Sequence, residues 1–151
     1  MKITTLSFVI SCLIFSACNN SPKPILAPEY ILENPDMHPI TSVFNKKNGT
    51  TSTLYGNDLV LKAARNENKS HNAGEVFTLI TSELKPNPYW FGGNINGAVK
   101  YTETVKVLAD ENGTRVVYEA KNNGSDVMKK VGADKQARIN FIFDQKAAVF
   151  P

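Results

Sequence analysis

The sequence contains little cysteine and histidine, and this scarcity excludes several kinds of site. Its 151 residues include two cysteines, Cys12 and Cys18, and two histidines, His38 and His71. Because both cysteines fall within the first 18 residues, the remainder can form no disulfide, no cysteine-based zinc site and no thiolate nucleophile. We therefore expect a domain that is stabilised by packing alone.

The two histidines also lack the spacing of metal ligands. His38 lies in a proline-rich stretch and His71 in the polar run 66–72, with no His-x-x-x-His motif. A lone histidine in a loop is usually solvated, so we expect no metal site. The sequence contains no Gly-x-Ser-x-Gly, Walker or dinucleotide-binding motif either. Sequence motifs therefore identify no catalytic residue.

Charge of one sign is not in excess. The chain has 17 Lys and Arg against 14 Asp and Glu, and the two signs are interspersed along it. Such a pattern offers no basic stripe that would follow a phosphate backbone, so we expect no nucleic-acid partner. The 42% hydrophobic content is ordinary for a globular protein, and the length suits one domain.

The N-terminus has the pattern of a bacterial secretory signal. Lys2 precedes an apolar run over residues 3–15, and the small residues Ser16 and Ala17 stand directly before Cys18. The run is shorter than the ~20 apolar residues that a membrane-spanning helix needs. We therefore predict a signal peptide over residues 1–17.

Residues 15–18 resemble the lipobox of bacterial lipoproteins, whose cysteine receives a lipid and becomes the new N-terminus. Phe15 stands where leucine is usual. This resemblance implies lipidation of Cys18 and an exported, membrane-anchored lipoprotein on the periplasmic or outer-membrane face. The alternative is a plain secretory signal in which Cys18 is incidental.

Proline content divides the rest of the chain. Five of the eight prolines lie between residues 19 and 39, and proline-rich segments are typical of extended spacers. We predict a lipidated cysteine and tether over residues 18–39, followed by one domain over residues 40–151.

Apolar residues in this domain alternate mostly with period two, which indicates strands. We predict strands at residues 51–55, 75–81 and 138–143. The clearest feature is a hairpin with its turn at residues 110–113. Its apolar faces consist of Val99, Tyr101, Val105 and Val107 on one strand and Val116, Tyr118 and Ala120 on the other. Glu103 shares the first of these faces, so it lies either at a sheet edge or in a pair.

Helical periodicity is weaker. Asn57 or Asp58 can cap a helix whose apolar face consists of Leu59, Val60, Ala63 and Ala64. A second helix is predicted over residues 125–135. The expected fold class is α+β, with a mainly antiparallel sheet and one or two packed helices.

One aromatic cluster attracts attention. Tyr89, Trp90 and Phe91 follow two prolines, which restrict the backbone, and precede two glycines, which allow close backbone approach. Three aromatic side chains in such a loop can line an apolar pocket. The other interpretation is that they plug the open end of the sheet.

Four segments together resemble the cytochrome P-460 family. The motifs that carry the likeness are Leu-Tyr-Gly-Asn, which includes Tyr55, and Trp-Phe-Gly, which includes Trp90 and Phe91. The resemblance spans residues 40–151 and rests on residues 52–58, 74–81, 89–100 and 137–143. It implies a cytochrome P-460-like domain, dimers as a state that the family often adopts, and a small-molecule pocket that we predict at Tyr55, Tyr89, Trp90 and Phe91.

Haem-bearing members of that family oxidise hydroxylamine or bind nitric oxide at a c-type haem attached through Cys-x-x-Cys-His near the C-terminus. Residues 126–143 of this chain contain neither cysteine nor histidine. The interpretation that we prefer is a haem-free, non-enzymatic member that binds a small molecule or a partner at the cell envelope. The alternative is a redox protein with haem held non-covalently by His71 or His38.

Overall fold

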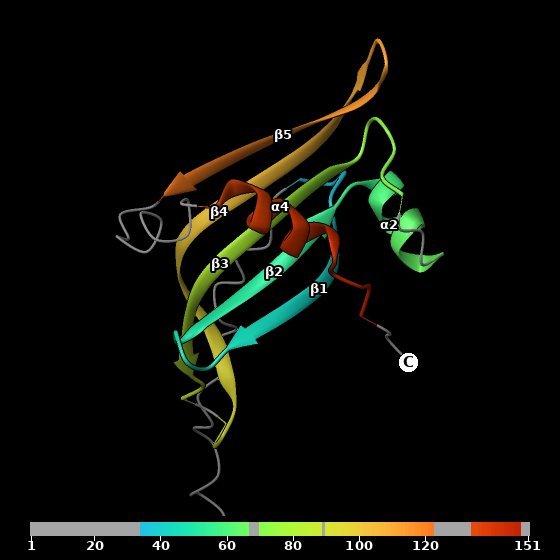
Figure 1. The fold of residues 1–151 in the computed structure, drawn as a ribbon. Helices are drawn as coiled ribbons and strands as arrows, with labels where there is room; N and C mark the ends of the chain where they lie inside the picture. The colour runs from blue at the N-terminus through green and yellow to red at the C-terminus, as the bar shows by residue number, and fades with distance from the viewer. Residues whose placement is uncertain (1–33, 67–69, 89, 123–133, 149–151) are drawn as a thin grey trace, which may run out of the picture.

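The computed structural model describes residues 34–66, 70–88, 90–122 and 134–148. These residues form a five-stranded antiparallel sheet in which strands adjacent along the chain are adjacent in space (Figure 1). The strands, in sheet order, are β1 (His38–Asn45), β2 (Thr50–Gly56), β3 (Val76–Pro86), β4 (Asn94–Asp110) and β5 (Gly113–Asn122).

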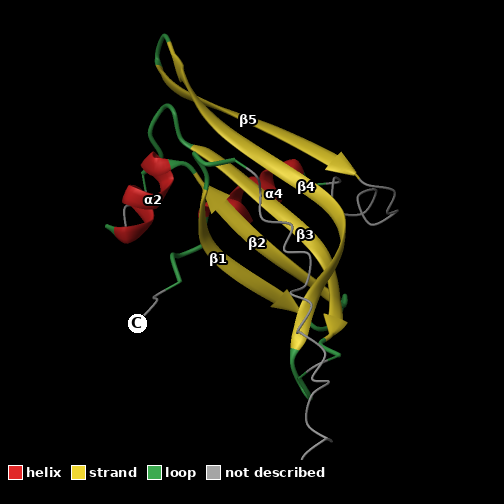
Figure 2. Cartoon of the chain, turned by 180° about the vertical axis from the view of Figure 1, so that it is seen from behind, coloured by secondary structure: helices red, strands yellow, loops and turns green. Residues whose placement is uncertain are grey.

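Two helices accompany the sheet in the described part of the chain. Helix α2 (Asp58–Arg65) connects β2 to β3 at one end of the sheet. Helix α4 (Lys135–Phe143) lies across one face, and seen from the other side the strands stand in front of it (Figure 2). The structure therefore confirms the predicted α+β class with a mainly antiparallel sheet.

The core lies between α4 and the sheet face that it covers. Leu54 of β2 is paired with Leu79 of β3, and both side chains are buried. Because side chains alternate between faces along a strand, Tyr55 points to the opposite face from Leu54. The core cluster consists of Ile40, Leu54, Val60, Phe77, Leu79, Val105, Val107, Ile139 and Ile142.

Several predicted elements are confirmed. The β4–β5 hairpin closes with Asp110 paired to Gly113, at the predicted turn. Strand β2 contains the whole of the strand predicted at residues 51–55, and β3 contains the strand predicted at residues 75–81 except for Glu75. Both strands extend beyond the predicted residues. In α2, Asn57 is the N-cap, and its side chain accepts a hydrogen bond from the backbone N–H of Val60.

The predicted strand at residues 138–143 is wrong, because this segment forms most of α4. The Asp134 side chain accepts a hydrogen bond from the backbone N–H of Ala137 and so caps the helix. Ile139 and Ile142, three residues apart, are the buried positions. A short apolar run fits a strand and a helix equally well by periodicity, and here the cap and tertiary packing favour the helix.

Two further expectations meet the structure only in part. The helix predicted over residues 125–135 lies outside the described residues except for Asp134, which caps α4, and Lys135, which begins it. At the other end, β1 begins at His38, two residues before the predicted start of the domain. Pro39 is compatible with this position because β1 is the edge strand of the sheet.

Candidate functional site

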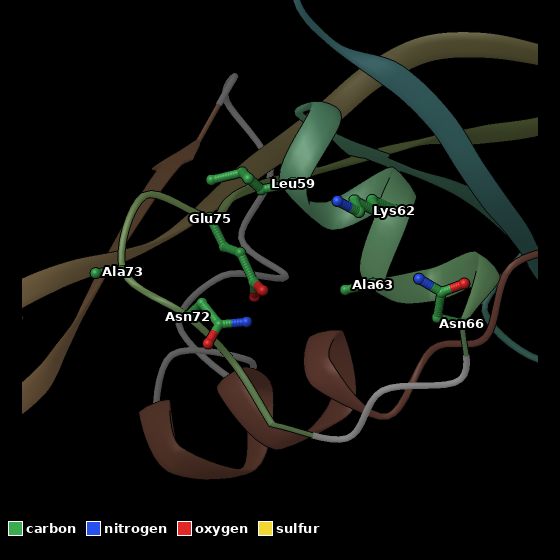
Figure 3. A pocket seen from close by; sticks show the side chains of 7 residues that line it. All are labelled: Leu59, Lys62, Ala63, Asn66, Asn72, Ala73 and Glu75. Carbon is green, nitrogen blue, oxygen red and sulfur yellow. The ribbon is translucent and has the colours of Figure 1, made fainter.

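A cavity of about 310 Å³ lies beside α2. One wall is a face of α2, and the other is the segment that leads into β3 (Figure 3). The lining combines apolar side chains with two amides, an ammonium group and a carboxylate: Leu59, Lys62, Ala63, Asn66, Asn72, Ala73 and Glu75. Ligand sites in proteins typically combine an apolar lining with a few polar groups that fix orientation, and they start at ~300 Å³.

Asn57 holds the two walls together. Its side-chain oxygen accepts from the backbone N–H groups of Val60 and Val76, both at 3.3 Å, and its side-chain nitrogen donates to the carbonyl of Gly74 at 2.8 Å. Its backbone N–H donates to the carbonyl of Val76 at 3.1 Å. One residue therefore caps α2 and fixes the segment across the cavity from it.

Gly56, next to Asn57, allows α2 to start close to the sheet. A Cβ atom on Gly56 would lie 2.3 Å from Cγ1 of Val60, the buried residue of α2. Gly74 has a φ of 95°, a left-handed conformation that glycine adopts without strain. Gly56 therefore lets α2 pack against the end of β2, and Gly74 lets the chain turn into β3.

Glu75 places a carboxylate in the wall of the cavity although its side chain is 1% exposed. Its Oε2 lies 2.8 Å from Nδ1 of His71, so the two side chains form a hydrogen-bonded pair. Burial of a carboxylate is costly unless it is paired and hydrogen-bonded, which is the role that His71 fulfils.

His71 is itself held by aromatic rings. Its ring stacks on Phe143 at 3.8 Å between centroids, and Phe77 packs against it nearly at right angles at 5.5 Å. The expectation of a solvated loop histidine is therefore wrong for His71, whose side chain is only 22% exposed. His38 lies at the start of β1, with Nε2 2.6 Å from Oδ1 of Asp58.

A second buried carboxylate has a structural role. Glu103 on β4 is fully buried and accepts hydrogen bonds from Arg138 of α4 and from the hydroxyl of Tyr118 on β5. The prediction of an edge position or a pair for Glu103 is thus resolved in favour of the pair. Burial and the hydrogen bond to Glu103 raise the pKa of the Tyr118 hydroxyl, and the hydrogen bond to Glu103 raises the pKa of Arg138. These partners join α4 to the sheet.

The structure does not bring Tyr55 together with Trp90 and Phe91. Tyr55 is buried on β2, where it is paired with Thr78 of β3. Trp90 and Phe91 lie at the tip of the β3–β4 hairpin, with 73% and 104% exposure, and Tyr89 lies outside the described residues. Thr78, the partner of Tyr55, and Pro86, next to this tip, are eight residues apart on β3, which is about 26 Å along the strand.

Sequence reasoning missed the cavity at α2. It placed Leu59 and Ala63 on a core-facing side of the helix, but Leu59 is 47% exposed and both residues line the cavity. The available signal was the series 59, 62, 63 and 66, whose spacing puts these residues on one helical face. Because these four residues mix apolar and polar side chains, their spacing alone does not indicate a binding site.

Comparisons with known proteins add no relative: no family model matches the chain, and no curated protein matches it. Within the described ranges, no helix is long and apolar enough to cross a membrane. Those ranges also contain no group of three or more His, Cys, Asp and Glu side chains placed to hold a metal ion.

Proposed function

We propose that this protein is an exported lipoprotein, anchored through Cys18, whose haem-free cytochrome P-460-like domain binds a small molecule without catalysing a reaction. The observation that carries the proposed binding function is the cavity beside α2, whose lining combines Lys62, Glu75 and two amides with three apolar side chains. The proposed ligand is a small zwitterion with an apolar group, such as a free amino acid.

The positions of the two family motifs support the cytochrome P-460-like assignment. Leu-Tyr-Gly-Asn ends at the junction of β2 and α2, where Gly56 and Asn57 have the structural roles described above. Trp-Phe-Gly lies at the tip of the β3–β4 hairpin. Each motif thus lies at a connection that shapes the fold.

The charge arrangement supports a zwitterionic ligand. Lys62 projects from α2 and makes no ion pair within the described residues, whereas Glu75 is buried on the facing wall (Figure 3). A ligand carboxylate would give Lys62 an ion-pair partner, and a ligand ammonium group near Glu75 would be a second partner for a carboxylate that His71 already pairs. Leu59, Ala63 and Ala73 would then contact the apolar part of the ligand.

The residues present do not fit haem. Both cysteines precede residue 19, so neither lies in a Cys-x-x-Cys-His motif. His71, the better placed of the two histidines, has Nδ1 paired with Glu75 and one ring face covered by Phe143. The cavity next to this pair is lined by four polar or charged side chains, which do not form the apolar slot that a porphyrin requires.

Ligand-dependent thermal stability tests the proposal. We expect leucine or a similar amino acid to raise the Tm of the purified domain saturably, because a ligand that binds the native state alone stabilises it by ~2.7 kcal/mol at a hundred-fold excess over Kd. Alkyl amines and alkyl carboxylates of the same size, each with one of the two charges, should give smaller shifts.

Two variants locate the effect. Ala63→Leu fills the cavity and should abolish the shift, whereas Ala109→Leu, at an exposed position of β4, should preserve it. Absence of a saturable shift across the amino acids would contradict the binding function. A Soret band with a positive pyridine haemochrome assay in the purified protein would instead favour the haem-binding alternative.

A further inference from the structure

The most exposed large apolar side chains gather at one end of the sheet. Among the described residues, Phe91, Trp90 and Phe44 are exposed by 104%, 73% and 61%. Phe44 lies near the end of β1, next to the β1–β2 turn, and the other two lie at the tip of the β3–β4 hairpin. Because large exposed apolar patches mark interaction sites, this end of the sheet is a candidate for one.

The turn and the hairpin tip are neighbours in space. The backbone N–H of Leu84 on β3 donates to the carbonyl of Gly49 in the β1–β2 turn at 2.9 Å. Beyond this contact the hairpin continues, and hydrogen bonds from Asn87 to Gly93 and from Gly93 to Trp90 close its tip. Both features lie at the end of the sheet opposite α2 (Figure 1).

Lysines accompany these aromatic side chains. Lys46 and Lys47 are exposed in the turn, and Lys85 is 56% exposed on β3, where Glu83 is its ion-pair partner at 3.4 Å. The charged residues of segments 44–49 and 83–94 are these three lysines and Glu83, so the two segments together have a net charge of +2. The end of the sheet thus combines protruding aromatic rings with an excess of positive charge.

We propose that this end of the sheet docks onto a lipid bilayer that contains anionic lipid, with Trp90 and Phe91 in the headgroup region and Lys46 and Lys47 at the lipid phosphates. Aromatic side chains, tryptophan above all, favour the membrane–water interface, and lysines near it are attracted to anionic headgroups. The exposed rings lie on one hairpin tip and one turn, and lysines flank them, a combination that suits an anionic bilayer.

The docking is independent of the proposed ligand binding but compatible with the lipid anchor. The 20 residues from Cys18 to His38 can extend over at most ~70 Å, enough to let the far end of the sheet reach the bilayer. Anchoring would raise the effective concentration of the tip at the membrane. Docking in this orientation holds the cavity beside α2 away from the bilayer.

Trp90 is the single tryptophan of the chain, so its fluorescence reports on the tip directly. The processed protein is reconstituted into vesicles of phosphatidylcholine, with and without phosphatidylglycerol; if it carries no lipid, it is added to the same vesicles in solution. We expect a blue-shifted emission and quenching by brominated acyl chains, both larger with phosphatidylglycerol. Emission of a water-exposed tryptophan in both vesicle types would overturn the proposal.

Matched variants test the two chemical components. Lys46→Gln with Lys47→Gln should lower the ratio of inserted to free tip roughly thirty-fold on anionic vesicles, about five-fold for each lysine. Lys106→Gln with Arg115→Gln, near the β4–β5 turn, should leave it unchanged. Phe91→Ser should likewise lower it, and Leu108→Ser should not. Insertion that is equally strong with and without anionic lipid, and with and without the Lys46 and Lys47 replacements, would overturn the assignment. Crosslinking of position 91 to a protein, together with a tryptophan emission that does not change on addition of vesicles, would also overturn it.

Discussion

Arg138 on α4 closes over Glu103 on β4 with two hydrogen bonds, from Nε to Oε1 at 2.8 Å and from a terminal guanidinium nitrogen to Oε2 at 2.5 Å. The carboxylate is fully buried, and the hydroxyl of Tyr118 donates to its Oε1 at 2.6 Å. Charge-assisted bonds of this bidentate kind are strong and geometrically specific. They fix how α4 lies on the sheet, and α4 in turn brings Phe143 to His71.

Removing one partner of this buried pair should be severely destabilising. We expect Arg138→Met to lower the free energy of unfolding by ~3–5 kcal/mol, because it leaves the Glu103 carboxylate buried without its cation. Urea denaturation followed by circular dichroism measures the change. The combined replacement of Glu103→Leu, Arg138→Met and Tyr118→Phe should recover most of the loss, since no buried charge or hydroxyl is then unpaired. A single variant as stable as the parent would refute this account.

Tyr118 predicts a specific response to alkaline pH. Burial and Glu103 raise the pKa of its hydroxyl in the folded state above the ordinary value near 10. The unfolded chain therefore loses this proton first, and the stabilisation, which is complete below pH ~10, falls as pH rises toward the folded-state pKa. Tyr118→Phe should flatten this part of the stability profile. Tyr101→Phe, at another buried position of the sheet, serves as the control and should retain the slope.

Asn57 predicts a graded series at the cavity. Asn57→Ala removes the cap of α2 and two links to the opposite wall, so we expect a loss of more than the ~1 kcal/mol typical of a cap alone. Asn57→Asp keeps the acceptor for Val60 but loses the donor to Gly74, so its loss should be smaller. Asn45→Ala is a suitable control because, within the part of the chain that the structure describes, its side chain accepts one exposed turn hydrogen bond, from Asn48. Equal losses for Ala and Asp at position 57 would mean that the cap contributes little.

The sequence predicts the strands well where alternation is long. Val105 and Val107 alternate with polar residues on β4, and a clear turn at residues 110–113 follows, so the hairpin was predictable. The segment with Ile139 and Ile142 was not, because its helix depends on the Asp134 cap and on burial against a distant sheet.

The candidate site was harder to predict for a related reason. Phe143, far along the chain, stacks on the ring of His71, which in turn is the partner of Glu75. Lys62 and Asn72 face one cavity because Asn57 fixes α2 against the next segment, and no local sequence pattern encodes that contact.

The exposure of Trp90 predicts a small effect on folding. With 73% of the residue exposed, Trp90→Ala should change the free energy of unfolding by no more than ~0.5 kcal/mol, as is usual at the surface. Phe77→Ala, in the core, should cost ~3–5 kcal/mol in the same assay. A loss of several kcal/mol at Trp90 would support a plug at the end of the sheet and would count against the docking tip.

The proposed lipid anchor makes the last prediction. In the parent, cleavage before Cys18 and its lipidation should place the protein in the membrane fraction, since several acyl chains, at ~0.8 kcal/mol per buried methylene, hold a protein firmly to a bilayer. Cys18→Ser removes the thiol that receives the lipid and should leave an uncut precursor or a soluble exported protein.

Metabolic labelling with a fatty-acid analogue measures this, and Cys12→Ser, within the predicted signal peptide, is the matched control that should still be labelled. Equal label in parent and Cys18→Ser would show that the lipid, if any, is attached elsewhere, whereas a cleaved and unlabelled parent would indicate a plain secretory signal. Loss of label at Cys18→Ser with normal label at Cys12→Ser is the result that the small residues before Cys18 lead us to expect.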